Sequence, residues 1–161
     1  MNDRLYSKVF EHALKLLGRR PRSVGEMRER LLEKVDAPEA VEQAISRLIE
    51  LGYLNDEEFA YNYATNRLSV KPLGRDRLRR ALIEKQVQPE AVDLALGRIF
   101  DEQDEGELCD QAVSRYLRLR GRPADRKQSR KLLAHLMRLG FSYDLVIKKL
   151  RSLASIDDPD E

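Results

Sequence analysis

The sequence predicts an all-α fold made of three copies of a small three-helix unit, with about nine helices in total. Two observations lead to this prediction: apolar residues recur at spacings of three and four, and the apolar pattern repeats about every 50 residues. Leu, Ala, Glu and Arg outnumber Val and Ile, which suits helices because unbranched side chains lose little rotamer freedom there. A charged fraction of 36% beside a hydrophobic fraction of 42% indicates that each helix buries one narrow stripe.

The first two expected helices are marked by an apolar stripe and by a capping signal. The stripe runs from Leu5 to Leu17, and Gly18 is expected to end this helix. Ser23 and Glu26 form a capping-box pattern, in which the serine oxygen and the glutamate each pair with a backbone N–H. A second helix is therefore expected to begin at this point.

The third expected helix opens at Pro38, where the missing N–H costs no hydrogen bond, and stops at Gly52. Asn55 or Asp56 is then expected to cap the first helix of the next unit. The buried stripe of the third helix is expected to consist of Val41, Ile45, Leu48 and Ile49.

An internal repeat supports this organisation. At an offset of 51 residues the segment Pro38-Glu39-Ala40-Val41 recurs as Pro89-Glu90-Ala91-Val92, and at a further offset of 54 residues Leu78 matches Leu132. Such self-similarity is typical of arrays in which neighbouring units bury one another's faces. We therefore predict three three-helix repeats, 1–52, 53–104 and 105–155, followed by an acidic tail, 156–161.

Neither a catalytic site nor a metal site is predicted. His12 and His135 have no Cys or His partner at metal-ligand spacing, and Cys109 has no neighbouring histidine that would form its thiolate. The acidic segment 101–107 lacks the glycine and the alternating ligands of a calcium loop, and we interpret it as a solvated linker. We expect a non-enzymatic protein without a cofactor or a metal ion.

The expected location is the cytoplasm. A single cysteine excludes an internal disulfide and suits a reducing compartment. No apolar run approaches the roughly 20 residues of a membrane span, and the charged amino-terminal residues do not resemble a signal peptide. The expected state is a monomer without membrane contact.

Basic residues gather in two stretches of a chain whose formal net charge is only +2. Residues 61–80 hold six basic residues against Asp76 alone, and residues 112–131 hold eight against Asp125 alone. Arginine pairs readily with phosphate and carboxylate groups, so the expected partner is either nucleic acid or an acidic protein groove. The candidate binding residues are Arg67, Lys71, Arg75, Arg77, Arg79, Arg80, Arg118, Arg122, Arg126, Lys127 and Arg130.

Four segments, in order along the chain, carry recognisable motifs. They are residues 22–34 (RSVGEMRERLLEK), 51–67 (LGYLNDEEFAYNYATNR), 73–87 (LGRDRLRRALIEKQV) and 132–150 (LLAHLMRLGFSYDLVIKKL). They resemble an RS-x-x-E-L segment, a Gly-x-Leu-Asn/Asp-Asp motif followed by Phe-Ala, a G-x-x-R-I/L segment and an L-x-x-R-G-F ending, which together resemble the RecX regulators of the bacterial recombinase RecA. Val35 and Gln86 stand where the family has glycine after lysine, so these turns must form without glycine, and Leu139 replaces the usual arginine.

The resemblance implies tandem repeats related to helix-turn-helix units, in an elongated, curved array, and no enzymatic activity. It also implies binding along the groove of the RecA–DNA filament, with inhibition of recombinase, ATPase and co-protease activities and an effect on DNA repair, recombination and the SOS response. Stimulation instead of inhibition, and capping of filament ends instead of coating of the groove, stay open at this point. The alternative is a helix-turn-helix-like protein that binds single- or double-stranded DNA independently of RecA. We interpret Gly52, Leu54, Asp56, Phe59 and Gly74 in these segments as structural residues.

Overall fold

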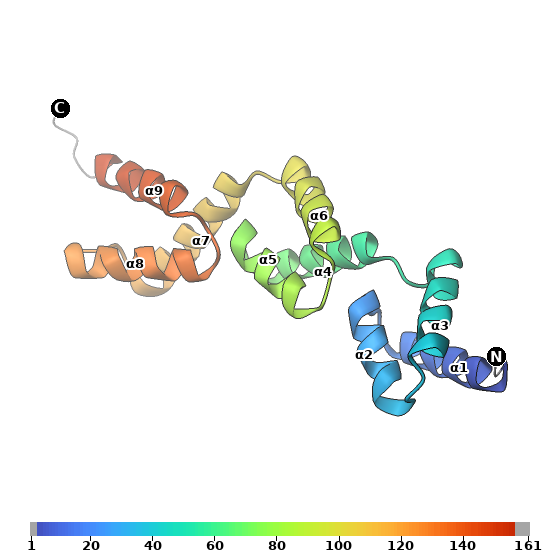
Figure 1. Ribbon diagram of the computed structural model, residues 1–161. Coiled ribbons are helices and arrows are strands. Elements are labelled where there is room, and N and C mark those ends of the chain that lie inside the picture. Colours follow the sequence, from blue (N-terminus) through green and yellow to red (C-terminus); the bar gives the residue numbers. More distant parts are fainter. Residues whose placement is uncertain (1–2, 157–161) are drawn as a thin grey trace. The chain divides into compact units, whose positions relative to one another are not determined.

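The computed structural model describes residues 3–156, which form nine α-helices and no strand (Figure 1). This confirms the all-α prediction and the expected number of helices. The acidic residues of the expected tail, 157–161, lie outside the described residues. The helices are α1 (Asp3–Arg19), α2 (Val24–Lys34), α3 (Pro38–Glu50), α4 (Asp56–Val70), α5 (Arg75–Glu84), α6 (Pro89–Glu102), α7 (Glu105–Arg120), α8 (Arg126–Arg138) and α9 (Tyr143–Ile156).

The helices belong to two compact units. The amino-terminal unit comprises the chain up to Tyr63 together with Leu82–Ala95, and the carboxy-terminal unit comprises Ala64–Ala81 together with the chain from Leu96 onward. The boundary between the units therefore passes through α4, α5 and α6. None of the helices within residues 3–156 has the length and apolarity that a membrane crossing requires.

In the amino-terminal unit, helices α1, α2 and α3 all pack against one another. Apolar residues that recur at the helical period lie on one face of each helix. These three faces meet in a core that excludes water. The buried members of this core are Val9, Ala13, Leu16, Met27, Leu31, Val41, Ala44, Ile45, Leu48 and Leu54.

Two details of the sequence prediction were wrong in this unit. Ile49 is 49% exposed and does not belong to the buried stripe of α3. Gly18 does not end α1, which continues to Arg19. The buried guanidinium of Arg22 instead donates from Nε to the carbonyl of Leu16 at 3.4 Å, and so provides a partner for one of the last carbonyls of α1.

In the carboxy-terminal unit, helices α7, α8 and α9 form a second mutually packed group, drawn in gold to red in Figure 1. Its core includes Cys109, Leu132, Leu136, Phe141 and Val146, each no more than 2% exposed. Burial raises the pKa of the Cys109 thiol to about 11, and this buried cysteine packs as a small apolar side chain.

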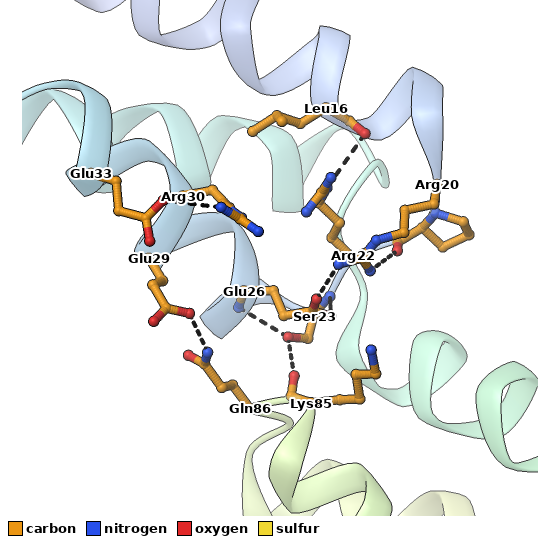
Figure 2. Close-up of polar contacts among 11 residues, drawn as sticks. Leu16, Arg20, Arg22, Ser23, Glu26, Glu29, Arg30, Glu33, Lys85 and Gln86 are labelled. Carbon is orange, nitrogen blue, oxygen red and sulfur yellow. Dashed lines mark hydrogen bonds and ion pairs between the residues drawn. The ribbon is translucent and has the colours of Figure 1, made fainter.

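A polar joint holds the start of α2 within the amino-terminal unit (Figure 2). Ser23 forms the predicted capping box with Glu26, and its hydroxyl also donates to the carbonyl of Lys85 in the turn between α5 and α6. The N–H of Val24 donates to Oδ1 of Asp56 at 2.8 Å, and Asn55 caps α4. Asp56 therefore accepts a hydrogen bond from another helix instead of capping its own.

The turn between α5 and α6 reaches this joint through a left-handed residue. Gln86 has a φ of +59°, a conformation that favours glycine, and its amide donates to Glu29. A Cβ atom at Gly25 would lie 2.6 Å from the Cβ of Gln86, so the two backbones approach more closely than a side chain would permit. Val35, at the corresponding place in the first repeat, is extended with a φ of −139°. The two turns that lack glycine therefore have different backbone conformations at this position.

A second joint, in the carboxy-terminal unit, holds the start of α5. The N–H of Gly74 donates to the carbonyl of Leu139 at 2.8 Å, and the N–H of Asp76 donates to the carbonyl of Gly140 at 3.2 Å. The N–H of Arg75 donates to Oε1 of Glu105 at 3.0 Å. The interpretation of the acidic segment 101–107 as a solvated linker is therefore wrong, because its first residues end α6, Asp104 caps α7, and Glu105 accepts a hydrogen bond from the backbone of Arg75.

The two joints use equivalent positions of the repeat. Val24 and Arg75, the first residues of α2 and α5, are 51 residues apart, and each donates its N–H to a carboxylate at the start of a later helix. Gln86 and Gly140 are 54 residues apart, and both have a positive φ. The second helix of one repeat is thus held by the first helix and by the turn of the following repeat. This arrangement is how neighbouring repeats stabilise one another.

Replacing Ser23 with alanine is expected to lower the free energy of unfolding by about 1–2 kcal/mol, because the cap of α2 and the bond to Lys85 are lost together. Thermal and urea unfolding followed by circular dichroism measure this change. Ser46, which is exposed on α3, provides the matched control, and its replacement with alanine is expected to change stability by less than about 0.5 kcal/mol. Equal effects at both serines would contradict the role of the joint.

Candidate binding surface

All eleven predicted basic residues lie in the carboxy-terminal unit. Three of them, Arg67, Arg75 and Arg79, are half-buried, and the other eight are exposed. By element, they are Arg67 on α4, Lys71 in the loop after α4, Arg75, Arg77, Arg79 and Arg80 on α5, Arg118 on α7, Arg122 in the loop after α7, and Arg126, Lys127 and Arg130 on α8.

Arg75 has a structural role within the chain. Its guanidinium carbon lies 4.6 Å from the ring centroid of Phe100, which is the geometry of a cation–π interaction. Its backbone N–H is the donor to Glu105 in the joint described above. These contacts account for its partial burial, so its charge is less available than that of exposed neighbours such as Arg77 and Arg80.

Two pairs of candidate arginines in the third expected repeat have the spacing of one helical turn, but only the pair on α8 lies within a helix. Arg126 and Arg130 lie one turn apart on α8, and both are exposed. Arg118 and Arg122 do not share a helix, because α7 ends at Arg120 and Gly121 follows as its cap. Some of the candidate binding residues therefore lie on helices and others in loops.

The carboxy-terminal unit also contains a cleft of about 240 Å³, which we call the Tyr116 cleft. It lies among the loop after α4 and helices α7 and α8. The apolar side chains of Pro72, Ala112 and Leu139 are buried there, whereas Lys71 and Arg115 are exposed. The complete lining is Lys71, Pro72, Ala112, Arg115, Tyr116, Leu119, Arg120, His135 and Leu139.

Aromatic rings and cations meet in this cleft. The rings of Tyr116 and His135 lie with their centroids 5.1 Å apart, and the guanidinium of Arg120 lies 5.6 Å from the ring centroid of Tyr116. Burial lowers the pKa of His135, and the positive charges of Arg138, Lys71 and Arg120 lower it further. The cleft is therefore positively charged even while His135 is neutral.

Sequence analysis missed Arg115, Arg120, Tyr116 and His135 as members of a common site. A signal was present, because Tyr116 and Arg120 are four residues apart on α7, as are Arg115 and Leu119. Of the predicted basic residues, only Lys71 lines the cleft. The other lining residues were not selected by the charge pattern. Within residues 3–156, no group of His, Cys, Asp and Glu side chains could hold a metal ion.

The stability of the carboxy-terminal unit is expected to fall as the pH drops below about 6.5. The folded pKa of His135 lies below its ordinary value of 6.5, so the unfolded chain binds more protons between the two values. The free energy of unfolding therefore rises with pH through this window. The contribution of His135 is lost as the pH falls below it. Urea unfolding between about pH 7.5 and about pH 5 measures the slope.

Two variants test whether His135 causes this pH dependence. Replacing His135 with glutamine is expected to reduce the slope, whereas the same change at His12, whose pKa is also lowered by burial, leaves the share of His135 intact. An unchanged slope in the His135 variant would contradict the electrostatic description of the cleft.

The fold and the surface define an all-α chain of three-helix units, in which α2 and α5 contact the following three-helix unit, with a basic carboxy-terminal unit. Two family models match such units in this sequence: the first three-helix domain of RecX over residues 10–48, and the second three-helix domain of RecX over residues 55–96. The chain belongs to the RecX family.

Relatives along nearly the whole chain support this assignment. The regulatory protein RecX of Chlorobaculum tepidum is 30% identical over 146 residues, which are 91% of this chain and 88% of that protein. The regulatory protein RecX of Pelodictyon phaeoclathratiforme is 29% identical and matches over 99% of both chains. The regulatory protein RecX of Bacillus subtilis is longer, and this chain covers 58% of it at 28% identity.

Solved structures share the fold. The crystal structure of RecX from Lactobacillus salivarius superposes with a TM-score of 0.83 at 20% identity, over 94% of this chain and 98% of that one. The crystal structure of a second regulatory protein RecX gives a TM-score of 0.72 at 24% identity, over 88% of this chain and 69% of that one. At these identities the likeness concerns the fold.

Proposed function

We propose that this protein is a non-enzymatic regulator that binds the groove of the RecA–DNA filament and inhibits the recombinase, ATPase and co-protease activities of RecA. Membership of the RecX family carries the proposal, because the relatives bear the name of a regulatory protein. In the cytoplasm, such binding would restrain recombination, DNA repair and the SOS response.

The basic carboxy-terminal unit supports the proposal. A protein filament on DNA carries phosphates and acidic side chains, and a surface of exposed cations attracts both. The proposed contacts are the eight exposed members of the predicted set: Lys71, Arg77, Arg80, Arg118, Arg122, Arg126, Lys127 and Arg130. We place the three repeats at 1–52, 53–104 and 105–155, and we assign most of the binding surface to the later ones.

Binding to three targets in parallel tests the proposal: RecA filaments on single-stranded DNA, the same DNA without RecA, and a duplex. The protein carries a fluorescent label, and each titration is repeated at several salt concentrations. We expect tight binding to the filament and weak binding to either bare DNA. Tight binding to bare DNA with a steep salt dependence would contradict the proposal and favour a direct DNA-binding protein that acts independently of RecA.

A further inference from the structure

The Tyr116 cleft combines a cationic rim with an apolar floor, and this combination selects a kind of partner. We propose that the cleft binds an acidic segment of a partner protein in which a bulky apolar side chain lies between carboxylates. The inference rests on the proposed function in one respect, since the expected partner is RecA, the protein of the filament. It adds the chemistry of the contact and the residues that make it.

The charge of the cleft favours an anionic ligand. Lys71 comes from the loop after α4, Arg115 and Arg120 from α7, and Arg138 from α8, so cations surround His135 from each of the elements that form the cleft. No carboxylate lines the cleft within the described part of the chain. Guanidinium groups bind carboxylates through paired hydrogen bonds, and such bonds are strongest where water is partly excluded.

Exposed apolar side chains beside the cleft favour a protein over a nucleic acid. Leu119 lines the cleft and is 81% exposed, and Val70 is 77% exposed, which makes them the most exposed large apolar side chains among the described residues. Val70 lies at the rim, because its carbonyl accepts a hydrogen bond from Arg115 at 3.4 Å. A phosphodiester backbone makes no use of such side chains, whereas the centres of protein interfaces are apolar and aromatic.

The dimensions of the cleft fit one inserted side chain. Its volume of about 240 Å³ is below the roughly 300 Å³ at which small-molecule sites begin. Pro72, Leu139 and the ring of Tyr116 would surround the inserted apolar group, while Arg115 and Arg120 would pair with the flanking carboxylates. An anchor buried in a small pocket with charges at its rim is the usual arrangement of an interface hot spot.

An NMR titration without any recombinase tests the inference on the intact chain. The probe is a short synthetic peptide of glutamates with a central leucine and phenylalanine, and its controls are the glutamine version and an oligothymidylate of equal charge. We expect the acidic peptide alone to shift the signals of Leu119, Tyr116 and His135. The pKa of His135 is expected to rise in the complex, because carboxylates then face its ring. No shift with the peptide, or a stronger response to the oligothymidylate, would overturn the inference.

Three variants connect the response to the cleft. Replacing Arg115 and Arg120 together with alanine is expected to weaken peptide binding at least about tenfold. Replacing Leu119 with serine keeps every charge and is also expected to weaken peptide binding. A purely ionic contact would be unaffected by this change. Lys148 is exposed on α9 outside the cleft, and its replacement with alanine is expected to leave binding unchanged. Equal loss in the Lys148 variant, or none in the Leu119 variant, would overturn the inference.

Peptide and filament binding by the wild-type protein together distinguish this inference from the proposed function. If the wild-type protein binds the peptide in the cleft but does not bind RecA filaments, the proposed function fails and the cleft assignment stands. If the wild-type protein binds filaments but the peptide leaves the signals of the cleft unchanged, the proposed function stands and this inference fails.

Discussion

Replacing Gly140 with alanine is expected to lower the free energy of unfolding of the carboxy-terminal unit by about 3 kcal/mol or more. Gly140 has a φ of +95°, where a side chain is strained by about 1–3 kcal/mol. A Cβ atom would also collide with the backbone N of Arg77 and would lie 2.8 Å from its Cα. The start of α5 would have to move, which would break the bonds to Leu139 and to Gly140 itself. Urea unfolding followed by circular dichroism measures the loss.

Gly52 is the matched control for this change. Its φ of +79° carries the same conformational cost, but no atom lies within 4 Å of the Cβ that alanine would add. We expect replacement with alanine at Gly52 to cost only about 1–2 kcal/mol. If the two substitutions destabilise the protein equally, the second joint contributes nothing beyond a left-handed turn.

Reversing the charges of Arg126 and Arg130 together to glutamate is expected to weaken binding to the RecA filament by roughly 30-fold. Each reversal removes an attraction and adds a repulsion, and four such changes of about 0.5 kcal/mol sum to about 2 kcal/mol. Both side chains are exposed on α8, and a glutamate at its first position suits the positive end of the helix. The fold is therefore expected to persist, and fluorescence titration against filaments measures the affinity.

The control for the charge reversal lies in the amino-terminal unit. Arg4 and Lys8 are exposed and one turn apart on α1, so their change to glutamate alters the net charge by the same amount. We expect a much smaller loss of affinity from this pair. A loss of the same size would mean that net charge, and not the carboxy-terminal surface, governs binding.

The helices could be predicted from the sequence because their signals are local. The apolar period placed the stripes of α1 and α3, and the pair Ser23 and Glu26 marked the start of α2, whose capping box the structure confirms. Ile49 continued the apolar pattern of α3 but is half exposed. Periodicity alone does not say how wide a face the neighbouring helices cover.

The joints could not be predicted because they depend on residues distant in sequence. A glutamine at position 86 does not by itself indicate a positive φ, and its close approach to Gly25, 61 residues earlier, is seen only in the folded chain. Glu105 is one acid among several in the sequence, and only the folded chain brings its carboxylate to the backbone N–H of Arg75. Long-range contacts of this kind leave no periodic signal in the chain.

The candidate surface was predicted in its charge but only in part in its geometry. The eleven basic residues come from two separate stretches, and the structure brings all of them into one compact unit. Arg75 is engaged with Phe100, whereas Arg115 and Arg120, which the charge pattern did not select, line the Tyr116 cleft. Charge patterning identifies a basic region, but burial and helix ends decide which of its members face a partner.

The central claim, that this member of the RecX family restrains RecA through direct binding to the filament, is tested most directly by the DNA-dependent ATPase activity of RecA. Purified protein is added in amounts up to stoichiometric with RecA, and filament length is followed in parallel. The account predicts that ATP hydrolysis falls as the protein is added and that the variant reversed at Arg126 and Arg130 requires a markedly higher concentration for the same effect. An ATPase activity that stays unchanged at stoichiometric wild-type protein would contradict it.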